Sequence, residues 1–175
     1  MEPPPDGRKP AVEYTLFAFN WWMEEEMMEG AIVCGVDGSS ESRAALRVAA
    51  QLSGQLGVPL VIAHVAQAAV FAPVPGATGQ AMSLPTEVEL RAGEELLEQI
   101  AEEEGLGEAS LRSLHGLAAE RLAELADEEA AAFVVVGSRG RGAFKAAFLG
   151  SVSRDLIGVA RCPVLVVPPG VGSPP

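Results

Sequence analysis

Glycines, serines and basic residues follow one another between residues 137 and 151 in an order suited to holding phosphate groups. This stretch opens with Gly137-Ser138-Arg139-Gly140 and closes with Gly150-Ser151, after an apolar run and before a helical pattern. Glycines at 137 and 140 allow close approach of the backbone to a ligand and positive φ, while Gly150-Ser151 offers an unobstructed amide and a hydroxyl at a helix N-terminus. The spacing predicts a polyphosphate site.

The distribution of charge supports a local anion site. The chain has 175 residues with 12 Lys and Arg against 24 Asp and Glu, a formal net charge of −12. Such a field disfavours general binding to nucleic acid or to anionic membranes. Residues 130–154 nevertheless contain no acidic residue and four basic ones: Arg139, Arg141, Lys145 and Arg154. Alternatively, this segment is a surface loop whose basic side chains pair with acidic helices elsewhere in the chain. Its position between a strand and a helix favours phosphate binding over that alternative.

The hydrophobic pattern indicates one α/β domain over residues 30–170. Continuous apolar runs alternate with helical periodicity, which is typical of parallel strands covered by helices. Five strands are predicted at 31–36, 59–65, 109–114, 132–136 and 164–167. Right-handed crossovers then favour an open, doubly wound, five-stranded parallel sheet with helices on both faces, and ligands beyond the carboxyl ends of its strands.

Four helices are expected between these strands. The first is capped by Ser39 or Ser40, and the second opens with the capping box Thr86-x-x-Glu89 and reaches Glu104. The third and fourth cover residues 118–129 and 151–160, and a loop is expected over residues 66–84.

The ends of the chain differ from this domain. Residues 1–29 hold five of the nine aromatic residues and three opening prolines, which favours a flexible extension or a misassigned start over a docking segment. The apolar run 14–23 is too short to span a bilayer at about 20 residues. Residues 171–175 form a C-terminal tail.

The cysteines and histidines are expected to be structural. Cys34 and Cys162 lie in apolar runs without metal-ligand spacing, so both are interpreted as buried thiols of a reducing cytoplasm. His64 and His115 are expected at strand ends, as packing or hydrogen-bonding residues rather than general bases.

The spacing Gly-x-x-Gly, nine residues, then Gly-Ser resembles the nucleotide-binding signature of the universal stress protein family. Gly137, Gly140, Gly150 and Ser151 occupy its positions, and the run 32–39, Ile-Val-Cys-Gly-Val-Asp-Gly-Ser, resembles the family's first strand. Ala63-His64-Val65 is similar to the end of its second strand. One departure is Gly35, where family members often have proline.

The resemblance implies an adenine-nucleotide-binding, α-hydrolase-like, Rossmann-like fold with strand order 3-2-1-4-5, often dimeric through the last strand. It implies that Asp37 contacts adenosine and Val65 contacts adenine, while the glycine-rich segment holds ribose and phosphates. The candidate nucleotide-binding residues are Gly35, Val36, Asp37, Val65, Gly137, Ser138, Arg139, Gly140, Gly150, Ser151, Val152 and Ser153. No catalytic residue and no metal ligand is assigned, and Mg²⁺ or Mn²⁺ is expected to enter with the phosphates of ATP.

Three functions follow as hypotheses. The first is a cytoplasmic, ATP-binding universal stress protein that acts as a nucleotide-dependent regulatory or interaction module, as a homodimer through the edge strand Val164–Val167. The second is a nucleotide-free dimer that mediates protein contacts. The third is a slow ATPase, although Asp37 is the one carboxylate expected near the site and its simpler role is a hydrogen bond to the nucleoside.

Overall fold

The computed structural model describes residues 30–67, 70–71, 81–82, 87–140 and 149–171, and these contain a five-stranded parallel sheet. Its strands are ordered β5-β2-β1-β6-β7, which is 3-2-1-4-5 in chain order, as predicted. The strand bounds are β1 Ile32–Gly35, β2 Leu60–Gln67, β5 Ser110–Gly116, β6 Phe133–Gly137 and β7 Val164–Val167.

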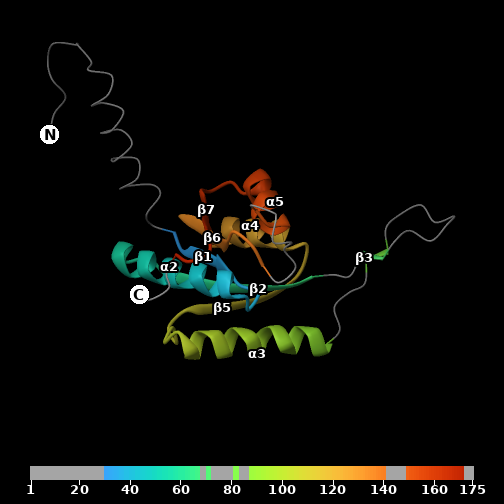
Figure 1. Cartoon of the computed structure of the whole chain (residues 1–175), viewed down its shortest axis with the longest axis horizontal. Helices are drawn as coiled ribbons and strands as arrows, with labels where there is room; N and C mark the ends of the chain where they lie inside the picture. The colour runs from blue at the N-terminus through green and yellow to red at the C-terminus, as the bar shows by residue number, and fades with distance from the viewer. Residues whose placement is uncertain (1–29, 68–69, 72–80, 83–86, 141–148, 172–175) are drawn as a thin grey trace, which may run out of the picture.

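Four helices connect these strands within the described residues (Figure 1). Their bounds are α2 Ser40–Leu56, α3 Glu87–Glu103, α4 Ala118–Glu128 and α5 Ser151–Val159. Wherever the end of a helix was predicted, the observed end lies within one residue of the prediction. Of the two serines predicted as the cap of α2, Ser39 is the observed one, and its side chain accepts a hydrogen bond from the Ser42 amide. Thr86 of the predicted capping box lies outside the described residues.

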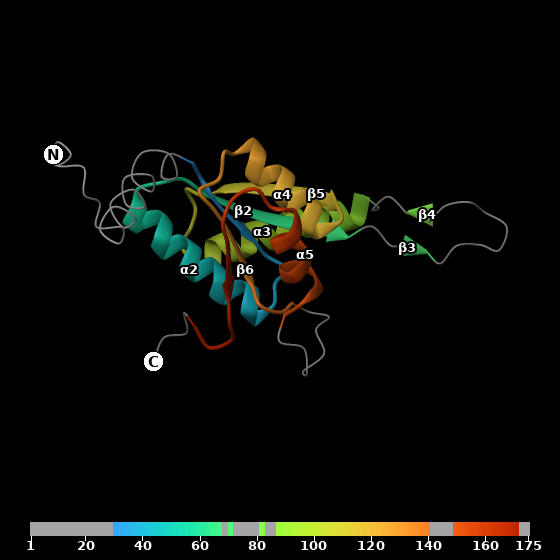
Figure 2. The same cartoon turned by 90° about the horizontal axis from the view of Figure 1, so that it is seen from above.

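The sheet is buried on both faces because successive strand residues point to opposite layers. In β1, Ile32 and Cys34 pack with α2 and α3, whereas Val33 packs with α4 and α5. Figure 2 looks onto the face that α4 and α5 cover. Period-2 alternation therefore appears in the sequence as one continuous apolar run, because both faces of the strand lie in a core.

The direction of winding reverses beside β1. From β1 the chain passes through α2 and α3 to β2 and β5 on one side, then returns through α4 and α5 to β6 and β7 on the other. The carboxyl ends of β1 and β6 therefore flank the point where a doubly wound sheet has its ligand crevice.

Two expectations about the strands are corrected. The loop predicted over 66–84 contains the end of β2 and a separate antiparallel ribbon of β3 Val70–Phe71 and β4 Ala81–Met82. His64 lies in the interior of β2 rather than at a strand end, whereas His115 is next to the last residue of β5. The two-residue strands, and the last residues of β2 beyond Val65, contain too few apolar positions to form a recognisable sequence pattern.

The two cysteines have different environments. Cys34 is fully buried, and burial raises the pKa of its thiol to about 12. Cys162, also predicted to be buried, is only half-buried, and partial burial raises its pKa from the ordinary value. Cys162 lies in the connection before β7, which is an edge strand of the sheet in the described part of the chain.

Residues 1–29 lie outside the described part of the chain. Over the part that is described, no helix combines the length and apolar character required to cross a membrane.

Candidate functional site

A cleft of about 600 Å³ opens at the carboxyl ends of β1, β2 and β6, between these strands and the start of α5. This volume lies within the range of about 300–1,000 Å³ that small-molecule sites occupy. The cleft is lined by every predicted site residue except Ser138. The crevice expected from the winding of the sheet therefore coincides with the residues expected from the sequence.

The β1 wall of the cleft is held by hydrogen bonds around Asp37. The Asp37 carboxylate oxygen Oδ1 accepts from the Ser39 amide at 3.0 Å and from the Ser39 hydroxyl at 2.6 Å. The Asp37 amide donates to Ser42 Oγ at 3.3 Å, and this hydroxyl donates to the Ser39 carbonyl at 3.0 Å. The turn that caps α2 thus also fixes the carboxylate that faces the cleft.

Gly140 and Gly137 serve close packing, and the prediction of positive φ at these positions is wrong. Among the described glycines, positive φ occurs elsewhere, at Gly38 for example. A Cβ at residue 140 would lie 2.4 Å from Asp37 Oδ2, and one at residue 137 would lie 2.9 Å from the Glu41 carbonyl. A side chain would clash at either position, because the end of β6 packs against the first turn of α2 and the following connection packs against the turn after β1.

The N-terminus of α5 lacks a side-chain cap. Gly150 is its N-cap residue, with φ −70° and ψ 166°, and no side chain there accepts from the first helical amides. The Gly150 amide itself, predicted to be free, donates to the Ser138 carbonyl at 2.7 Å. The amides available to an anion are therefore those of the following residues, from Ser151 onward.

The Ser153 hydroxyl is structural. It is buried and donates to the Gly137 carbonyl at 2.8 Å, which ties the first turn of α5 to the end of β6. Ser153 can therefore face a ligand only through its backbone, whereas the exposed Ser151 keeps its side chain at the rim of the cleft.

Two polar groups of the β6–α5 connection are buried without a hydrogen-bond partner among the described residues. They are Arg139 Nε and Ser138 Oγ. Arg139 lines the cleft and Ser138 lies just behind it, since the amide of Ser138 donates to the Val167 carbonyl at 2.8 Å. A buried donor without a partner costs free energy. Arg139 also brings a positive charge to the lining of the cleft, which favours an anion there.

Two arginines of the predicted basic patch, Arg139 and Arg154, line the cleft. Arg154 is exposed, and its Nε lies 3.2 Å from the Asp155 carboxylate. Arg141 and Lys145, the other two predicted members of the basic patch, lie outside the described residues.

Sequence reasoning missed several lining residues, chiefly His64, Ser42 and Leu122. His64 was assigned a packing or hydrogen-bonding role, and its Nδ1 does lie 2.9 Å from the Val36 carbonyl oxygen. A polar residue inside an otherwise apolar strand, directly before Val65, was the available signal. Leu122 left no signal because a leucine on the inner face of a helix looks the same whether it borders a core or a cleft.

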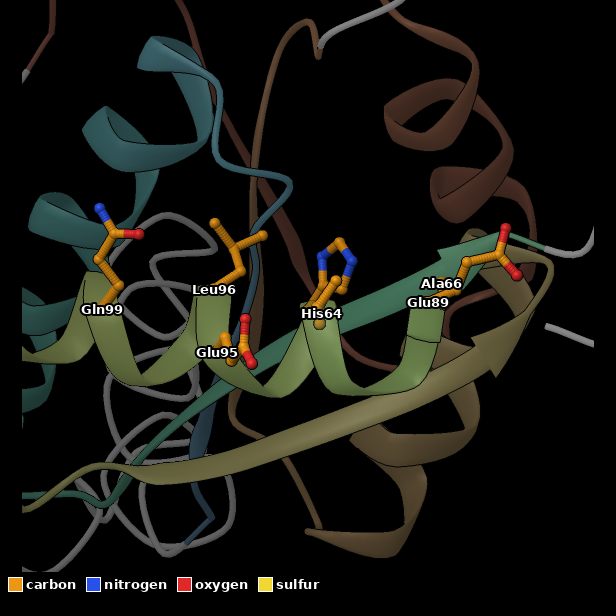
Figure 3. A pocket seen from close by; sticks show the side chains of 8 residues that line it. His64, Ala66, Glu89, Glu95, Leu96 and Gln99 are labelled. Atoms are coloured by element: carbon orange, nitrogen blue, oxygen red, sulfur yellow. The ribbon is translucent and has the colours of Figure 1, made fainter. Parts of the chain in front are cut away.

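A second hollow, of about 400 Å³, lies along α3 (Figure 3). It shares the lining residues His64 and Ala66 with the cleft. The polar residues that α3 contributes to it are Glu89, Glu95 and Gln99, without a basic residue. His64 thus contributes to the lining of both hollows.

Comparison with known proteins identifies the family. The family model described as the universal stress protein family matches residues 28–168. The chain belongs to the universal stress protein family. A universal stress protein of Thermus aquaticus is 31% identical over 140 residues, which cover 78% of this chain and 96% of that protein. A universal stress protein of Mycobacterium tuberculosis is also 31% identical, over 155 residues that cover 83% of this chain and 50% of its own. The chain therefore spans about half the length of such mycobacterial relatives.

Solved structures share the fold of this universal stress protein. One, titled as a universal stress protein in complex with cAMP, has a TM-score of 0.59 and 24% identity, with coverage of 79% of this chain and 96% of that one. Another, from Archaeoglobus fulgidus and titled as a complex with dAMP, has a TM-score of 0.54 and 23% identity, with coverage of 79% and 97%.

Proposed function

We propose that this universal stress protein binds an adenine nucleotide in the cleft at the carboxyl ends of β1 and β6. The observation that carries the proposal is the α5 side of this cleft, where the helix N-terminus lacks a side-chain cap and the positively charged Arg139 lines the same cleft. Both favour an anion, and a phosphate chain supplies several acceptor oxygens at once. The acidic charge of the whole chain restricts such binding to this locality.

The nucleoside would occupy the other end of the cleft. Gly35, Val36, Asp37 and Val65 line that end, where apolar side chains suit a purine and the Asp37 carboxylate suits a ribose hydroxyl. Structures of the same fold titled as cAMP and dAMP complexes support an adenine nucleotide as the ligand class. Asp37 is already oriented by Ser39, so little ordering of the β1 wall would accompany binding.

The nucleotide we propose is ATP, with Mg²⁺ or Mn²⁺ bound through its phosphates. Among the described residues, no three His, Cys, Asp or Glu side chains lie together in a way that could hold a metal ion. A divalent cation would therefore depend on phosphate oxygens and water, as Mg²⁺ commonly does at nucleotide sites.

In this proposal the protein works in the cytoplasm as a nucleotide-dependent regulatory or interaction module in the stress response, as a homodimer through β7. This strand lies at the edge of the sheet, and Val164, Leu165 and Val166 are half-buried in the single chain. An apolar edge strand is commonly covered or paired with another chain. Sedimentation velocity at micromolar concentration measures whether the pairing occurs.

The test of nucleotide binding compares two glycine-to-glutamate substitutions, one inside the cleft and one outside it. In Gly140→Glu the side chain must displace the Asp37 carboxylate and adds negative charge at the cleft, so ATP binding by calorimetry should fall below detection. Gly158→Glu introduces the same charge on α5, at an exposed glycine with no atom within 4 Å of its would-be Cβ and outside the cleft lining. It should bind ATP as the wild type does.

Circular dichroism and thermal melting of both variants separate loss of binding from loss of the fold. A folded Gly140→Glu protein that binds ATP with unchanged affinity contradicts the proposal. Wild-type protein that neither carries an adenine nucleotide through native purification nor binds one on titration favours the nucleotide-free dimer.

A further inference from the structure

His64 makes one hydrogen bond that bears directly on the wall of the cleft. Its Nδ1 lies 2.9 Å from the Val36 carbonyl oxygen, and a carbonyl only accepts, so Nδ1 carries the hydrogen. Val36 is the residue after β1 and directly precedes Asp37. Figure 3 shows the imidazole of His64 on β2, next to α3. His64 lines both hollows.

The same peptide unit is held at its other end by a second side chain. The amide of Asp37 donates to Ser42 Oγ at 3.3 Å, and Ser42 is buried in the first turn of α2. The carbonyl and the amide of the peptide between Val36 and Asp37 are therefore both bonded to side chains, His64 from β2 and Ser42 from α2. In addition, the Val36 amide donates to the Ala63 carbonyl at 2.8 Å. These bonds set the plane from which the Asp37 side chain departs.

Helix α3 holds the imidazole in place through Gly93. A Cβ at this buried position would lie 2.9 Å from His64 Cδ2 and 3.1 Å from Ser113 Oγ. Glycine weakens the interior of a helix, so its presence in the middle of α3 needs a structural reason. The reason here is space: the ring occupies the volume that any other residue at 93 would fill.

We propose that His64 is a positioning residue for the nucleotide site, held against the Val36 carbonyl by the space at Gly93 so that Asp37 keeps its orientation toward the ligand. The inference rests on the proposed nucleotide binding and assigns how the β1 wall of that site is maintained. His64 acts through Asp37, and α3, which contributes no residue to the cleft, acts through His64.

The first experiment compares His64→Phe with His64→Asn by ATP titration. Phenylalanine keeps a ring but removes the donor to Val36, so affinity should fall about tenfold, the effect of losing one well-placed polar contact to the ligand. Asparagine places an amide donor near the position of Nδ1 and should recover most of the affinity. A purely structural role would change the melting temperature of both variants without this selective recovery. Unchanged affinity in a folded His64→Phe protein overturns the inference and leaves nucleotide binding intact.

A double-mutant cycle separates positioning from direct contact. In an Asp37→Ala background there is no carboxylate to orient, so adding His64→Phe should reduce affinity further by less than about twofold. If the full tenfold loss persists in that background, the imidazole contacts the ligand itself and the positioning role is overturned. Wild-type protein that binds no adenine nucleotide overturns the proposed function, and this inference with it, before any variant is made.

The second experiment tests the contribution of α3. Gly93→Ala forces the imidazole to move although residue 93 lies outside the cleft lining, so its ATP affinity should fall as in His64→Phe. Gly54→Ala in α2 is the matched control, because nothing lies within 4 Å of its would-be Cβ. Equal affinity in both alanine variants, each folded, overturns the role assigned to Gly93.

Discussion

The β1–α2 and β6–α5 connections leave adjacent parallel strands at the same edge of the sheet, yet they treat their polar groups in opposite ways. In the first, Ser39 caps α2 and also donates to Asp37, so side chains satisfy the turn from within. In the second, α5 starts at Gly150 without a side-chain cap, and Arg139 Nε is buried without a partner among the described residues.

This contrast distinguishes the β1 wall of the cleft, whose shape is fixed by its own hydrogen bonds, from the β6 wall, whose donors are left for a ligand. A turn that satisfies its own donors has little to offer a ligand but holds its shape. A turn that leaves donors unsatisfied is less stable alone and gains most when an anion arrives. The cleft needs both, since the Asp37 carboxylate packs directly against Gly140 of the second connection.

The largest effect is expected when the second connection is made to resemble the first. In Gly150→Asp the new carboxylate can cap α5, because Gly150 has φ and ψ that other residues adopt, and its would-be Cβ meets only ordinary contacts at 3.5 Å. It would take the amides that we assign to phosphate. Losing two hydrogen bonds to a charged group, each about 1.5 kcal/mol, lowers ATP affinity about 100-fold in calorimetry.

The stability of Gly150→Asp should move the other way. Aspartate exceeds glycine as an N-cap by a few tenths of a kcal/mol, so the melting temperature of the nucleotide-free protein should hold or rise slightly. Gly158→Asp on the same helix controls for the added charge and should bind normally. Unchanged affinity in Gly150→Asp would show that the phosphates do not use the start of α5.

A smaller loss is expected from Arg139→Gln. The substitution removes the charge and the buried Nε donor of the second connection, so ATP affinity should fall about tenfold, in keeping with one charge-assisted bond. Arg112→Gln removes the same charge from an exposed arginine paired with Glu129, remote from the cleft lining. If both variants lose affinity equally, the effect is general electrostatics and the contrast between the connections fails.

The sequence predicted the strands and helices of the main sheet from local signals, whereas the order of the strands came from the family resemblance. All the predicted site residues except Ser138 line the cleft. Apolar runs, turn residues and the spacing from Gly137 to Ser151 each act over a few neighbouring positions. The resemblance to one family then supplied the roles of residues at the ends of separate strands. Ser138 was included with them, but it lies behind the cleft.

What the sequence could not show was how distant segments press on one another. Gly140 lacks a side chain because of Asp37, and Gly93 because of His64, and neither pairing has a local pattern. Positive φ was the natural explanation for glycines in a loop, since a single sequence does not reveal which neighbour occupies the missing Cβ volume. For the same reason the sequence did not reveal that the Ser153 hydroxyl, predicted to contact the ligand, is hydrogen-bonded to the Gly137 carbonyl in the fold.

The smallest effect is expected in the first connection, from Ser39→Ala. This variant removes the cap of α2, since the Ser42 amide loses its acceptor at 3.2 Å, and the free energy of unfolding should fall by about 1 kcal/mol in urea. It also removes the hydroxyl donor to Asp37, but the Ser39 amide still donates to the same oxygen. Since Val36 and Asp37 keep their bonds to His64 and Ser42, the carboxylate stays directed at the cleft, and ATP affinity should fall less than in Arg139→Gln. A larger loss of affinity than in Arg139→Gln would contradict this expectation and would mean that the Asp37 carboxylate depends on the Ser39 hydroxyl for its orientation toward the ligand.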